Sequence, residues 1–485
     1  MKKLSELYPV YTGEEVEIKD IKINSKEIEK GDLFICTMGV TRDRHDFIDD
    51  AIKKGASAIV VSKDVEERTV PIIKVDDTNK ELPKLCRRFF DHPEEKLKLI
   101  SVGGTDGKTT TATIIQALLT DEVCGYIGTN GRRCKSFDKE TNNTTPDSDK
   151  LYKYFDEFLK SGCTTVAMET SSEAFFRNRL DGIYYDYGVI TNITSEHLNI
   201  HGSFENYLEC KCQQFRQIKK DGIAILNKDD KYYEEVKKVI NGQIKTYGSS
   251  KDCDLFIKTY KVFPNKTEIT YVYENEEYFI VSPLLGEFNV YNLAAGILVA
   301  LSNGIPFDVI KQRIINIKVS GRLEMLPRMG QNFDVMIDYA HTPNGIENLL
   351  KFVHTLNIKR SIVVIGQAGE RDYLKRPVVG KVVCDNASYA IFCYEDPRSE
   401  DPKDIIDMMV RDVHDSSKYE IVIDRSKAIK RAIEIASEND IVLILGKGNE
   451  TYEKLKDEVI YFNDKEEALK HLKERIETEK NYVTT

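Results

Sequence analysis

A glycine-rich run contains side chains that could hold the phosphates of a nucleotide. The apolar segment 99–102 is followed by GGTDGKT at 103–109, and an amphipathic pattern continues through residue 119. Glycines let backbone N–H groups turn toward phosphate oxygens, and the start of a helix adds positive potential. Lys108 could reach the β- and γ-phosphates, and Thr109 could ligate Mg²⁺. The run predicts an ATP site formed by Gly104, Thr105, Asp106, Gly107, Lys108, Thr109 and Thr110.

The spacing of this run differs from the common G-x-x-x-x-G-K-[ST] pattern, because Val102 occupies the position of its first glycine. A strained glycine turn without a ligand is the alternative interpretation. An apolar strand before the loop and a helix after it are the context that phosphate binding requires. The surrounding elements therefore favour the nucleotide site.

The elements around the loop predict an α/β protein of several domains. A chain of 485 residues exceeds the size of one hydrophobic core, which indicates roughly three domains. Residues 1–96 alternate short apolar runs at 33–36, 58–61 and 72–75 with helical patterns. They are predicted to form a small N-terminal α/β domain.

Two further domains are expected after it. Residues 97–319 are predicted to form a central P-loop ATPase domain with a mostly parallel sheet, in which 166–168 and 188–190 are buried strands. Alternating residues at 255–281 predict an antiparallel insert. Residues 320–485 are predicted to form a Rossmann-like domain. Its expected strands lie at 335–337, 362–365, 390–393, 421–423 and 441–445.

Composition narrows the classes of function. The chain is 41% hydrophobic and 31% charged, which is typical of ordinary globular proteins. We find neither the apolar run of a signal peptide nor one long enough to span a bilayer, so we expect a cytoplasmic protein without a membrane partner. A formal charge of −10 argues against nucleic-acid binding. Ten cysteines without a CxxC pair indicate reduced thiols.

The loop resembles the GTxGKT signature of the Mur ligase family, and further motifs follow in that family's order along nearly the whole chain. The resemblance is greatest to members that attach meso-diaminopimelate or L-lysine to UDP-N-acetylmuramoyl-L-alanyl-D-glutamate during peptidoglycan biosynthesis. It implies ATP and Mg²⁺ as cofactors. It also implies a UDP-muramoyl-dipeptide and a diamino acid as binding partners. The UDP part of the substrate is then expected to be bound by the domain of residues 1–96, and the amino acid by the domain of residues 320–485. A monomer is the expected state.

The resemblance assigns metal ligands to the ends of predicted strands. Glu169 in METSSE and His197 in EHLNIHG match the family's Mg²⁺-binding glutamate and histidine. Lys211, in YLECKCQQF, matches the lysine that the family carbamylates, which would help to hold a second Mg²⁺ beside the substrate. By themselves, these residues could be a loop carboxylate, a core histidine and an exposed lysine. The expected metal ligands are Thr109, Glu169, His197 and carbamylated Lys211.

Other polar side chains resemble the family's substrate contacts. Thr144 and Thr145 match an NTTP segment, and Ser171 and Arg179 follow the metal glutamate. Hydroxyl and guanidinium donors suit a substrate that carries carboxylates and phosphates. Turn formation and helix capping are the alternative roles. Near the N-terminus, Ser25 stands where the family has Asp-Ser-Arg beside the uridine moiety.

Nucleotide contacts are also implied outside the loop. Asn289 and Asn292, in GEFNVYNLAA, resemble the adenine-side contacts, although Asn289 could equally cap a helix. Motifs of the C-terminal domain are expected to meet the nucleotide when the domains close. The residues concerned are Arg322, Asp338, His341 and, at the γ-phosphate, Arg371.

The amino-acid pocket departs most from the family's motifs. Members that use meso-diaminopimelate carry DNPR, whose arginine binds the distal carboxylate. At these positions the chain has Glu395, Asp396, Pro397 and Arg398. Arg398 favours diaminopimelate through bidentate geometry, whereas Asp396 in place of Asn adds a charge that suits an amine, as in lysine-adding members. Gly446 and Glu450, in GKGNE, resemble the GKGHE motif, again a diaminopimelate-type feature.

Together these matches imply an ATP-dependent acid–amino-acid ligase. We expect the γ-carboxylate of the D-glutamate residue to be activated as an acyl phosphate and then joined to meso-diaminopimelate. The expected catalytic residues are Lys108, His197, Lys211 and Arg371.

Three alternatives remain open. They are the same ligase using L-lysine, a folylpolyglutamate synthetase-like enzyme, and a non-catalytic or regulatory nucleotide-binding member of the family. Departures from the family's motifs keep the last one open, at Asp106, Glu173, Glu196 and Asn199. The joint presence of Lys108, Glu169, His197 and Lys211 weighs against it.

Overall fold

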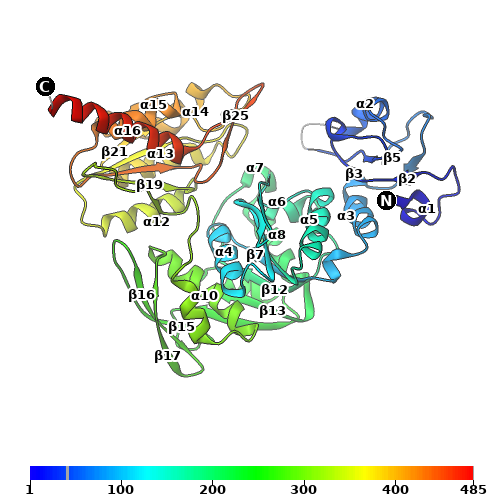
Figure 1. Ribbon diagram of the computed structural model, residues 1–485, viewed down its shortest axis with the longest axis horizontal. Helices are drawn as coiled ribbons and strands as arrows, with labels where there is room; N and C mark the ends of the chain where they lie inside the picture. Colours follow the sequence, from blue (N-terminus) through cyan, green and yellow to red (C-terminus); the bar gives the residue numbers. More distant parts are fainter. Residues whose placement is uncertain (40–42, 142, 484–485) are drawn as a thin grey trace.

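The computed structural model describes residues 1–39, 43–141 and 143–483. Within these residues the strands form one four-stranded, one eleven-stranded and one six-stranded sheet, with two small two-stranded sheets beside them. The large sheets succeed one another along the chain, and Figure 1 shows them as three separate α/β units with the central one between the other two. The predicted fold class, α/β with three domains, is confirmed.

The N-terminal unit contains a parallel sheet in the order β3-β4-β5-β6. Its strands are β3 (Ile21–Lys22), β4 (Leu33–Ile35), β5 (Ala58–Val61) and β6 (Ile72–Lys74). Beside it, β1 (Lys2–Lys3) pairs with β2 (Glu17–Ile18). The helices are α1 (Leu4–Leu7), α2 (Ile48–Lys53) and α3 (Thr78–Phe89). The three predicted apolar runs all form strands here.

The central unit has the strand order β10-β9-β8-β11-β7-β12-β13-β14-β15-β16-β17, and β8, β11, β7, β12, β13, β14 and β15 are parallel. The strands around the loop are β7 (Lys98–Gly103), β8 (Cys124–Gly128), β9 (Gly131–Cys134), β10 (Phe137–Lys139), β11 (Thr165–Glu169) and β12 (Tyr185–Ile190). The remaining ones are β13 (Ile218–Asn227), β14 (Gln243–Gly248), β15 (Leu255–Val262), β16 (Thr267–Tyr273) and β17 (Glu276–Ser282). The predicted antiparallel insert is β15–β17, which continues the sheet at one edge (Figure 1).

Helices cover both faces of the parallel part of this sheet. Ile100 and Val102 pack into one core with α4 (Lys108–Leu119) and α10 (Glu287–Ser302), whereas Leu99 packs into another with α5 (Ser148–Lys160). The other helices are α6 (Ser172–Phe176), α7 (Leu198–His201), α8 (Phe204–Arg216), α9 (Tyr233–Lys237) and α11 (Phe307–Ile314). Because successive residues of a strand point to opposite faces, a strand covered on both sides is apolar throughout.

The C-terminal unit has the strand order β18-β19-β23-β20-β21-β22, with all neighbours parallel except β18 and β19. The strands are β18 (Glu324–Met325), β19 (Asp334–Asp338), β20 (Ser361–Ile365), β21 (Tyr389–Phe392), β22 (Tyr419–Ile421) and β23 (Ile441–Leu445), followed by the hairpin β24 (Tyr452–Lys454) and β25 (Val459–Tyr461). The helices are α12 (Pro343–His354), α13 (Lys375–Asn386), α14 (Pro402–Val410), α15 (Arg425–Ile435) and α16 (Asp464–Val483). Cores lie on both faces of the sheet.

The strand expected at 421–423 is displaced toward the N-terminus. β22 ends at Ile421, and Asp424 already caps α15 by accepting a hydrogen bond from the Lys427 backbone N–H. β22 is also the edge strand, so Ile421 and Ile423 are exposed. The apolar residues of this run therefore lie at the exposed edge of the sheet and not in its core.

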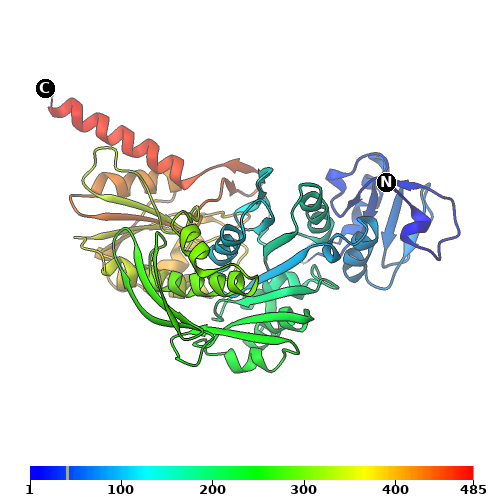
Figure 2. The same cartoon turned by 60° about the horizontal axis from the view of Figure 1, so that its bottom comes forward.

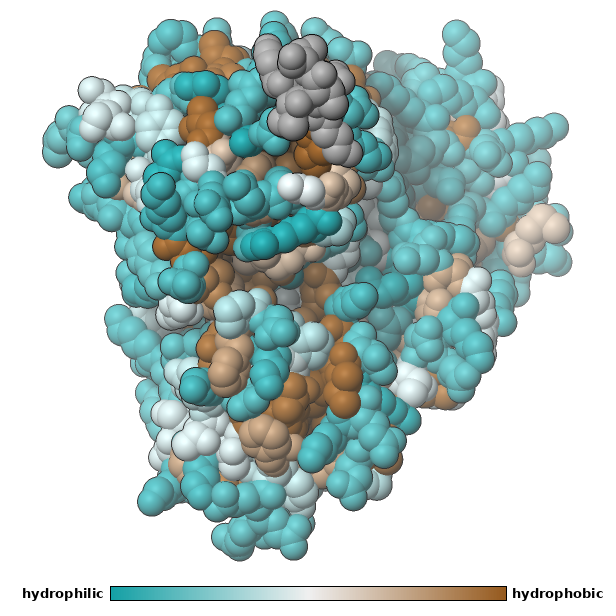
Figure 3. Space-filling model, turned by 60° about the vertical axis from the view of Figure 1, so that its left-hand side comes forward, coloured by the Kyte–Doolittle hydropathy of each residue, from teal (hydrophilic) through white to brown (hydrophobic). Residues whose placement is uncertain are grey.

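The outline is extended, and the α16 helix projects from the C-terminal unit (Figure 2). The face in Figure 3 is mainly hydrophilic, with hydrophobic patches between the charged side chains. Among the described residues, no helix combines the length and the apolar character that crossing a membrane requires.

Candidate active site

The phosphate-type loop joins β7 to α4, as predicted. Gly104 and Gly107 have φ angles of 134° and 84°, a region that residues with a Cβ rarely adopt. A Cβ on Gly104 would lie 1.9 Å from the Thr191 Oγ1, and one on Gly107 would lie 2.5 Å from the Asn292 Oδ1. Both backbone strain and crowding therefore require glycine at these positions. The turn leaves the N-terminus of α4 facing the cavity in which an anion could bind.

Two lysines converge on this loop, Lys108, which is half-buried, and Lys211, which is buried. The Lys108 Nζ donates to the carbonyls of Gly104 at 3.1 Å and Thr105 at 2.8 Å, and the Lys211 Nζ donates to Gly104 at 2.7 Å. Burial lowers the pKa of both amines, and for Lys211 the nearby charge of Lys108 adds to the effect, so that its pKa lies well below the ordinary value. This shift favours the neutral amine, which is the form that attacks CO₂.

A buried carboxylate stands beside the start of α4. Glu169 ends β11 and accepts hydrogen bonds from the Thr109 hydroxyl at 3.0 Å and the Tyr126 hydroxyl at 2.6 Å. The Thr129 backbone N–H also donates to it, at 2.9 Å. A fixed carboxylate beside a threonine hydroxyl is a donor set that suits Mg²⁺. These residues fit a magnesium ion at the phosphate loop.

His197 lines the same cavity as Glu169, and its backbone adopts a left-handed φ of 57° before α7. Burial and then the charges of Lys375 and Lys108 lower the pKa of His197 well below its ordinary value, so the imidazole is neutral and able to ligate a metal. Glu169 and His197 do not belong to a compact trio of ligands. Within the described part of the chain, such a trio within 4.8 Å occurs at His92, Glu94 and Glu95.

The trio at the surface of the N-terminal unit is a weak metal site, because Arg87 already donates to Glu94 at 2.7 Å and to Glu95 at 2.8 Å. Its carboxylates are thus neutralised by a neighbouring cation.

Three polar contacts bring the C-terminal unit to the phosphate loop. The Arg322 Nη2 donates to the Thr109 Oγ1 at 3.0 Å. The Thr342 hydroxyl lies 3.3 Å from Asp106, which stands in the loop itself. The third contact is a buried ion pair of 2.9 Å between Lys375 and Glu196. Thr342, Lys375 and Glu196 were not predicted as site residues; the RDYLKRP and EHLNIHG motifs that contain the last two were the available signal.

One cavity of about 980 Å³ runs between the two units. It brings together most of the predicted site residues from segments far apart in the chain. From the loop and central unit these are Gly104, Thr105, Asp106, Gly107, Lys108, Thr109, Thr144, Thr145, Glu169, Ser171, Arg179, His197 and Lys211. From the C-terminal unit they are Arg322, His341, Arg371, Glu395, Asp396, Arg398, Gly446 and Glu450.

Ser25 instead lines a second cavity, of about 590 Å³, between the N-terminal and central units. Arg44, Lys150 and Arg177 line it too, which makes its wall basic in places. Arg179 borders both cavities, and its Nε pairs with Asp147 at 2.6 Å. A long anionic substrate could therefore reach from one cavity into the other.

Five predicted residues lie outside both linings. Thr110 and Pro397 are two of them. Asn289 and Asn292 are buried beneath the loop, where Asn292 accepts from the Thr111 hydroxyl at 3.2 Å; the N-cap of α10 is Gly286, so the capping alternative for Asn289 is wrong. Asp338 accepts from the backbone N–H groups of Leu323 and Ala340, both at 2.7 Å, and so shapes the entry into the C-terminal unit.

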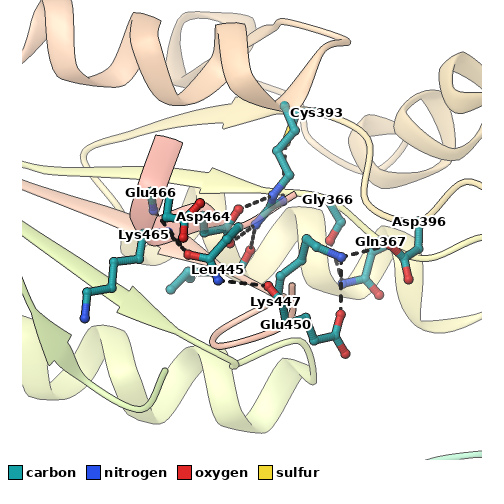
Figure 4. Close-up of polar contacts among 12 residues, drawn as sticks. Gly366, Gln367, Cys393, Asp396, Leu445, Lys447, Glu450, Asp464, Lys465 and Glu466 are labelled. Carbon is teal, nitrogen blue, oxygen red and sulfur yellow. Dashed lines mark hydrogen bonds and ion pairs between the residues drawn. The ribbon is translucent and has the colours of Figure 1, made fainter. Parts of the chain in front are cut away.

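The pocket in the C-terminal unit is built around a buried lysine. The Lys447 Nζ lies 2.8 Å from the Asp396 Oδ1 and 3.2 Å from the Glu450 Oε2 (Figure 4). The Lys454 backbone N–H also donates to Asp396, at 3.2 Å. Asp396 is therefore already paired with a cation of the protein itself.

Two further carboxyl groups near Lys447 have buried oxygens that accept no hydrogen bond. They are the Glu395 Oε2 and both carboxyl oxygens of Glu453, judged against the described residues. Burial raises the pKa of Glu395 to about 8 and that of Glu453 to about 7, although Arg425 and Lys447 oppose the shift in both cases. Arg425 itself forms a fully buried pair of 2.7 Å with Asp464 at the start of α16.

Comparison with known families gives three matches in succession. Residues 17–91 match the "Mur ligase family, catalytic domain", residues 102–300 the "Mur ligase middle domain", and residues 321–448 the "Mur ligase, glutamate ligase domain".

Full-length relatives are similar over almost their whole length. Two proteins named UDP-N-acetylmuramoyl-L-alanyl-D-glutamate--2,6-diaminopimelate ligase, from Clostridium perfringens and Bacillus cereus, are each 36% identical to this chain. The matches cover 95% of the chain and 96% of the Clostridium perfringens protein, and 97% of both chains for Bacillus cereus.

Solved structures agree with the fold. A ligase structure of the same name has a TM-score of 0.65 at 26% identity and covers 98% of this chain and 99% of its own. The MurF ligase from Thermotoga maritima in complex with ADP has a TM-score of 0.65 at 18% identity, covering 95% and 98%, and supports the fold alone.

Proposed function

Because this chain belongs to the Mur ligase family, we propose that it joins meso-diaminopimelate to UDP-N-acetylmuramoyl-L-alanyl-D-glutamate at the expense of ATP. The observation that supports this most is the single cavity that connects the phosphate loop to a charged pocket in the C-terminal unit. A ligase of this kind must hold a nucleotide, a carboxylate and an amine together. Activity of the relatives, as their names state it, agrees with such a site.

In the first step, a γ-carboxylate oxygen of the D-glutamate residue attacks the γ-phosphorus of ATP. The bond between that phosphorus and the bridging β-oxygen breaks, which yields an acyl phosphate and ADP. Lys108 and Arg371 are proposed to offset the negative charge that develops on the phosphoryl oxygens. Thr145 and Arg179 would orient the substrate beside them.

Mg²⁺ would be held by Thr109, Glu169 and His197, and would neutralise phosphate charge when bound. Lys211 is proposed to carry a carbamate. Its neutral Nζ would add to CO₂ and lose a proton, which converts a buried amine into an anion that suits a second cation.

In the second step, the amine of the incoming amino acid attacks the acyl carbon, the bond to the phosphate oxygen breaks, and phosphate leaves. Arg398, Gly446 and Glu450 are proposed to orient this amino acid. Contacts such as Arg322–Thr109 and Lys375–Glu196 hold the C-terminal unit against the loop, which would keep water away from the acyl phosphate.

The same ligase using L-lysine is the second candidate. This candidate rests on one observation, the presence of Asp396 in the amino-acid pocket. Since Asp396 is already paired with Lys447, this carboxylate is not free to bind a substrate amine. The structure's arrangement therefore supports diaminopimelate.

We further propose a monomeric cytoplasmic enzyme with domain boundaries after residues 96 and 319. Adenine-side contacts by Asn289 and Asn292 also remain a prediction.

The test is ADP release with ATP, Mg²⁺ and the UDP-muramoyl-dipeptide, with meso-diaminopimelate or L-lysine offered separately and the product identified by mass. We expect ADP release and a product heavier by one diaminopimelate residue. ATP turnover without any ligated product would contradict the proposal. The absence of ADP release with either amino acid would also contradict it and would favour a non-catalytic member of the family.

A further inference from the structure

Three basic side chains line the amino-acid end of the large cavity without a carboxylate partner. They are Arg371, Arg398 and Lys454. Among the described residues none of them takes part in an ion pair within 4.0 Å, and the hydrogen bond recorded for the Arg398 guanidinium goes to the Gly369 carbonyl at 3.2 Å. Lys447, a few residues away, is by contrast saturated by two carboxylates. The pocket thus contains three cations without a carboxylate partner and a fourth, Lys447, that is already paired.

The three cations are close enough to repel one another. Burial and then the charge of Arg371 lower the pKa of Arg398. Burial and then the charge of Arg398 lower the pKa of Lys454, and Arg371 contributes to the same shift. Like charges that converge in a half-buried pocket are unfavourable unless an anion joins them. Asp396 opposes both pKa shifts, but it forms its ion pair with Lys447 and with neither of these side chains, so the arrangement suits an anionic ligand.

The backbone keeps Lys454 beside Arg398. The Arg398 N–H donates to the Lys454 carbonyl at 3.0 Å, and the Lys454 N–H donates to Asp396 at 3.2 Å. The Lys454 Nζ lies over the Tyr452 ring, 4.7 Å from its centroid. The β24 strand thus places this ammonium group next to the guanidinium that the motif comparison associates with a carboxylate.

We propose that Lys454 is a specificity-determining residue, which together with Arg398 binds the second carboxylate of the amino-acid substrate. The inference rests on the proposed function and deepens it. L-Lysine has one carboxylate and meso-diaminopimelate has two, so a cluster of three free cations suits the dicarboxylate. Glu395 and Glu450 line the same cavity, and Glu450 is already paired with Lys447.

The experiment measures steady-state kinetics of the full-length enzyme with meso-diaminopimelate and L-lysine. Lys454→Met removes the charge and keeps the aliphatic stem, Lys454→Arg restores a cation, and Lys456→Met is the matched control, because Lys456 is exposed in the turn of the same hairpin and lies outside the cavity lining. Hydrogen bonds to charged groups of this kind correspond to roughly 10- to 100-fold in affinity.

We expect Lys454→Met to raise the KM for diaminopimelate about 10- to 100-fold. The KM values for ATP and the UDP-muramoyl-dipeptide should stay unchanged, and the preference for diaminopimelate over L-lysine should fall by the same factor. Lys454→Arg should recover most of the loss, and Lys456→Met should behave like wild type.

An unchanged KM for diaminopimelate in Lys454→Met overturns the inference while the ligase assignment stands. Equal losses with both amino acids also overturn it, since Lys454 would then bind the carboxylate that they share. A wild-type enzyme that ligates neither amino acid refutes the proposed function itself, and the inference with it.

Discussion

The phosphate loop and the amino-acid pocket line one cavity but are built in different ways. The loop is a single run between β7 and α4, and it offers backbone N–H groups and glycine φ angles that side chains cannot replace. The pocket is assembled from three separate segments, at 371, 395–398 and 446–454, and it works through charged side chains. One region depends on backbone geometry and the other on charge balance.

This difference determines how each region responds to substitution. Any side chain at Gly104 or Gly107 meets atoms closer than 3.0 Å, so the loop tolerates little change. In the pocket, a new charge at Asp396 is matched by the buried ammonium of Lys447. Substitutions there are coupled, because an unpaired buried charge is costly.

The largest effect is expected at the loop. Lys108→Met should lower kcat/KM for ATP by about 1000-fold or more, since a preorganised cation beside the transferring phosphoryl group is lost. ADP release would be measured with Lys135→Met as the control, because Lys135 is exposed and pairs with Glu122 at the surface. Activity within about tenfold of wild type would show that Lys108 does not act at the phosphate site.

Lys211 should have the next largest effect. Lys211→Met and Lys211→Arg should each lower kcat by roughly 100-fold, because neither side chain can become a carbamate. Removal of CO₂ and bicarbonate from the buffer should slow the wild-type enzyme and leave both variants unaffected. A fully active Lys211→Arg enzyme would show that a permanent cation suffices and that no carbamate forms.

A smaller effect is expected in the pocket. Asp396→Asn leaves Lys447 with Glu450 as its remaining carboxylate, and should raise the KM for the amino acid by about 3- to 10-fold without changing the KM for ATP. Asp385→Asn is a matched control, since Asp385 forms an exposed pair with Lys381. A rise in the KM for ATP would show that the loop and the pocket do not act independently.

The smallest effect concerns stability and pH. The folded-state pKa of Glu395, about 8, lies above its ordinary value of 4.5. Its contribution to stability is therefore fully present below pH 4.5 and is lost as the pH rises through 8. Glu395→Gln is neutral throughout, so its Tm relative to wild type should rise by about 2–4 °C between pH 5 and pH 8. Parallel Tm curves for the two proteins across this range would contradict the buried neutral acid.

Much of the fold followed from local sequence patterns. Apolar runs in the sequence marked strands of the central sheet, such as β7. The loop was identified because its glycines, Lys108 and Thr109 stand in one uninterrupted segment before α4. Glu169 and His197 needed the family resemblance, since a single carboxylate or imidazole carries no distinctive pattern.

The charge pairs of the pocket were not predictable in this way. Lys447 meets Asp396 across 51 positions of sequence, and Arg425 meets Asp464 across 39. Nothing in the run around Lys454 distinguishes its lysine from exposed neighbours such as Lys456. Such residues acquire their environment only when distant segments come together.

The central claim is that a substrate carboxylate is activated at the loop before the pocket delivers an amine. The most direct test uses UDP-muramoyl-dipeptide labelled with ¹⁸O in the γ-carboxylate of its D-glutamate residue, turned over with ATP and meso-diaminopimelate. An acyl phosphate requires one labelled oxygen to appear in the released phosphate. Phosphate without label, alongside ligated product, would contradict the account.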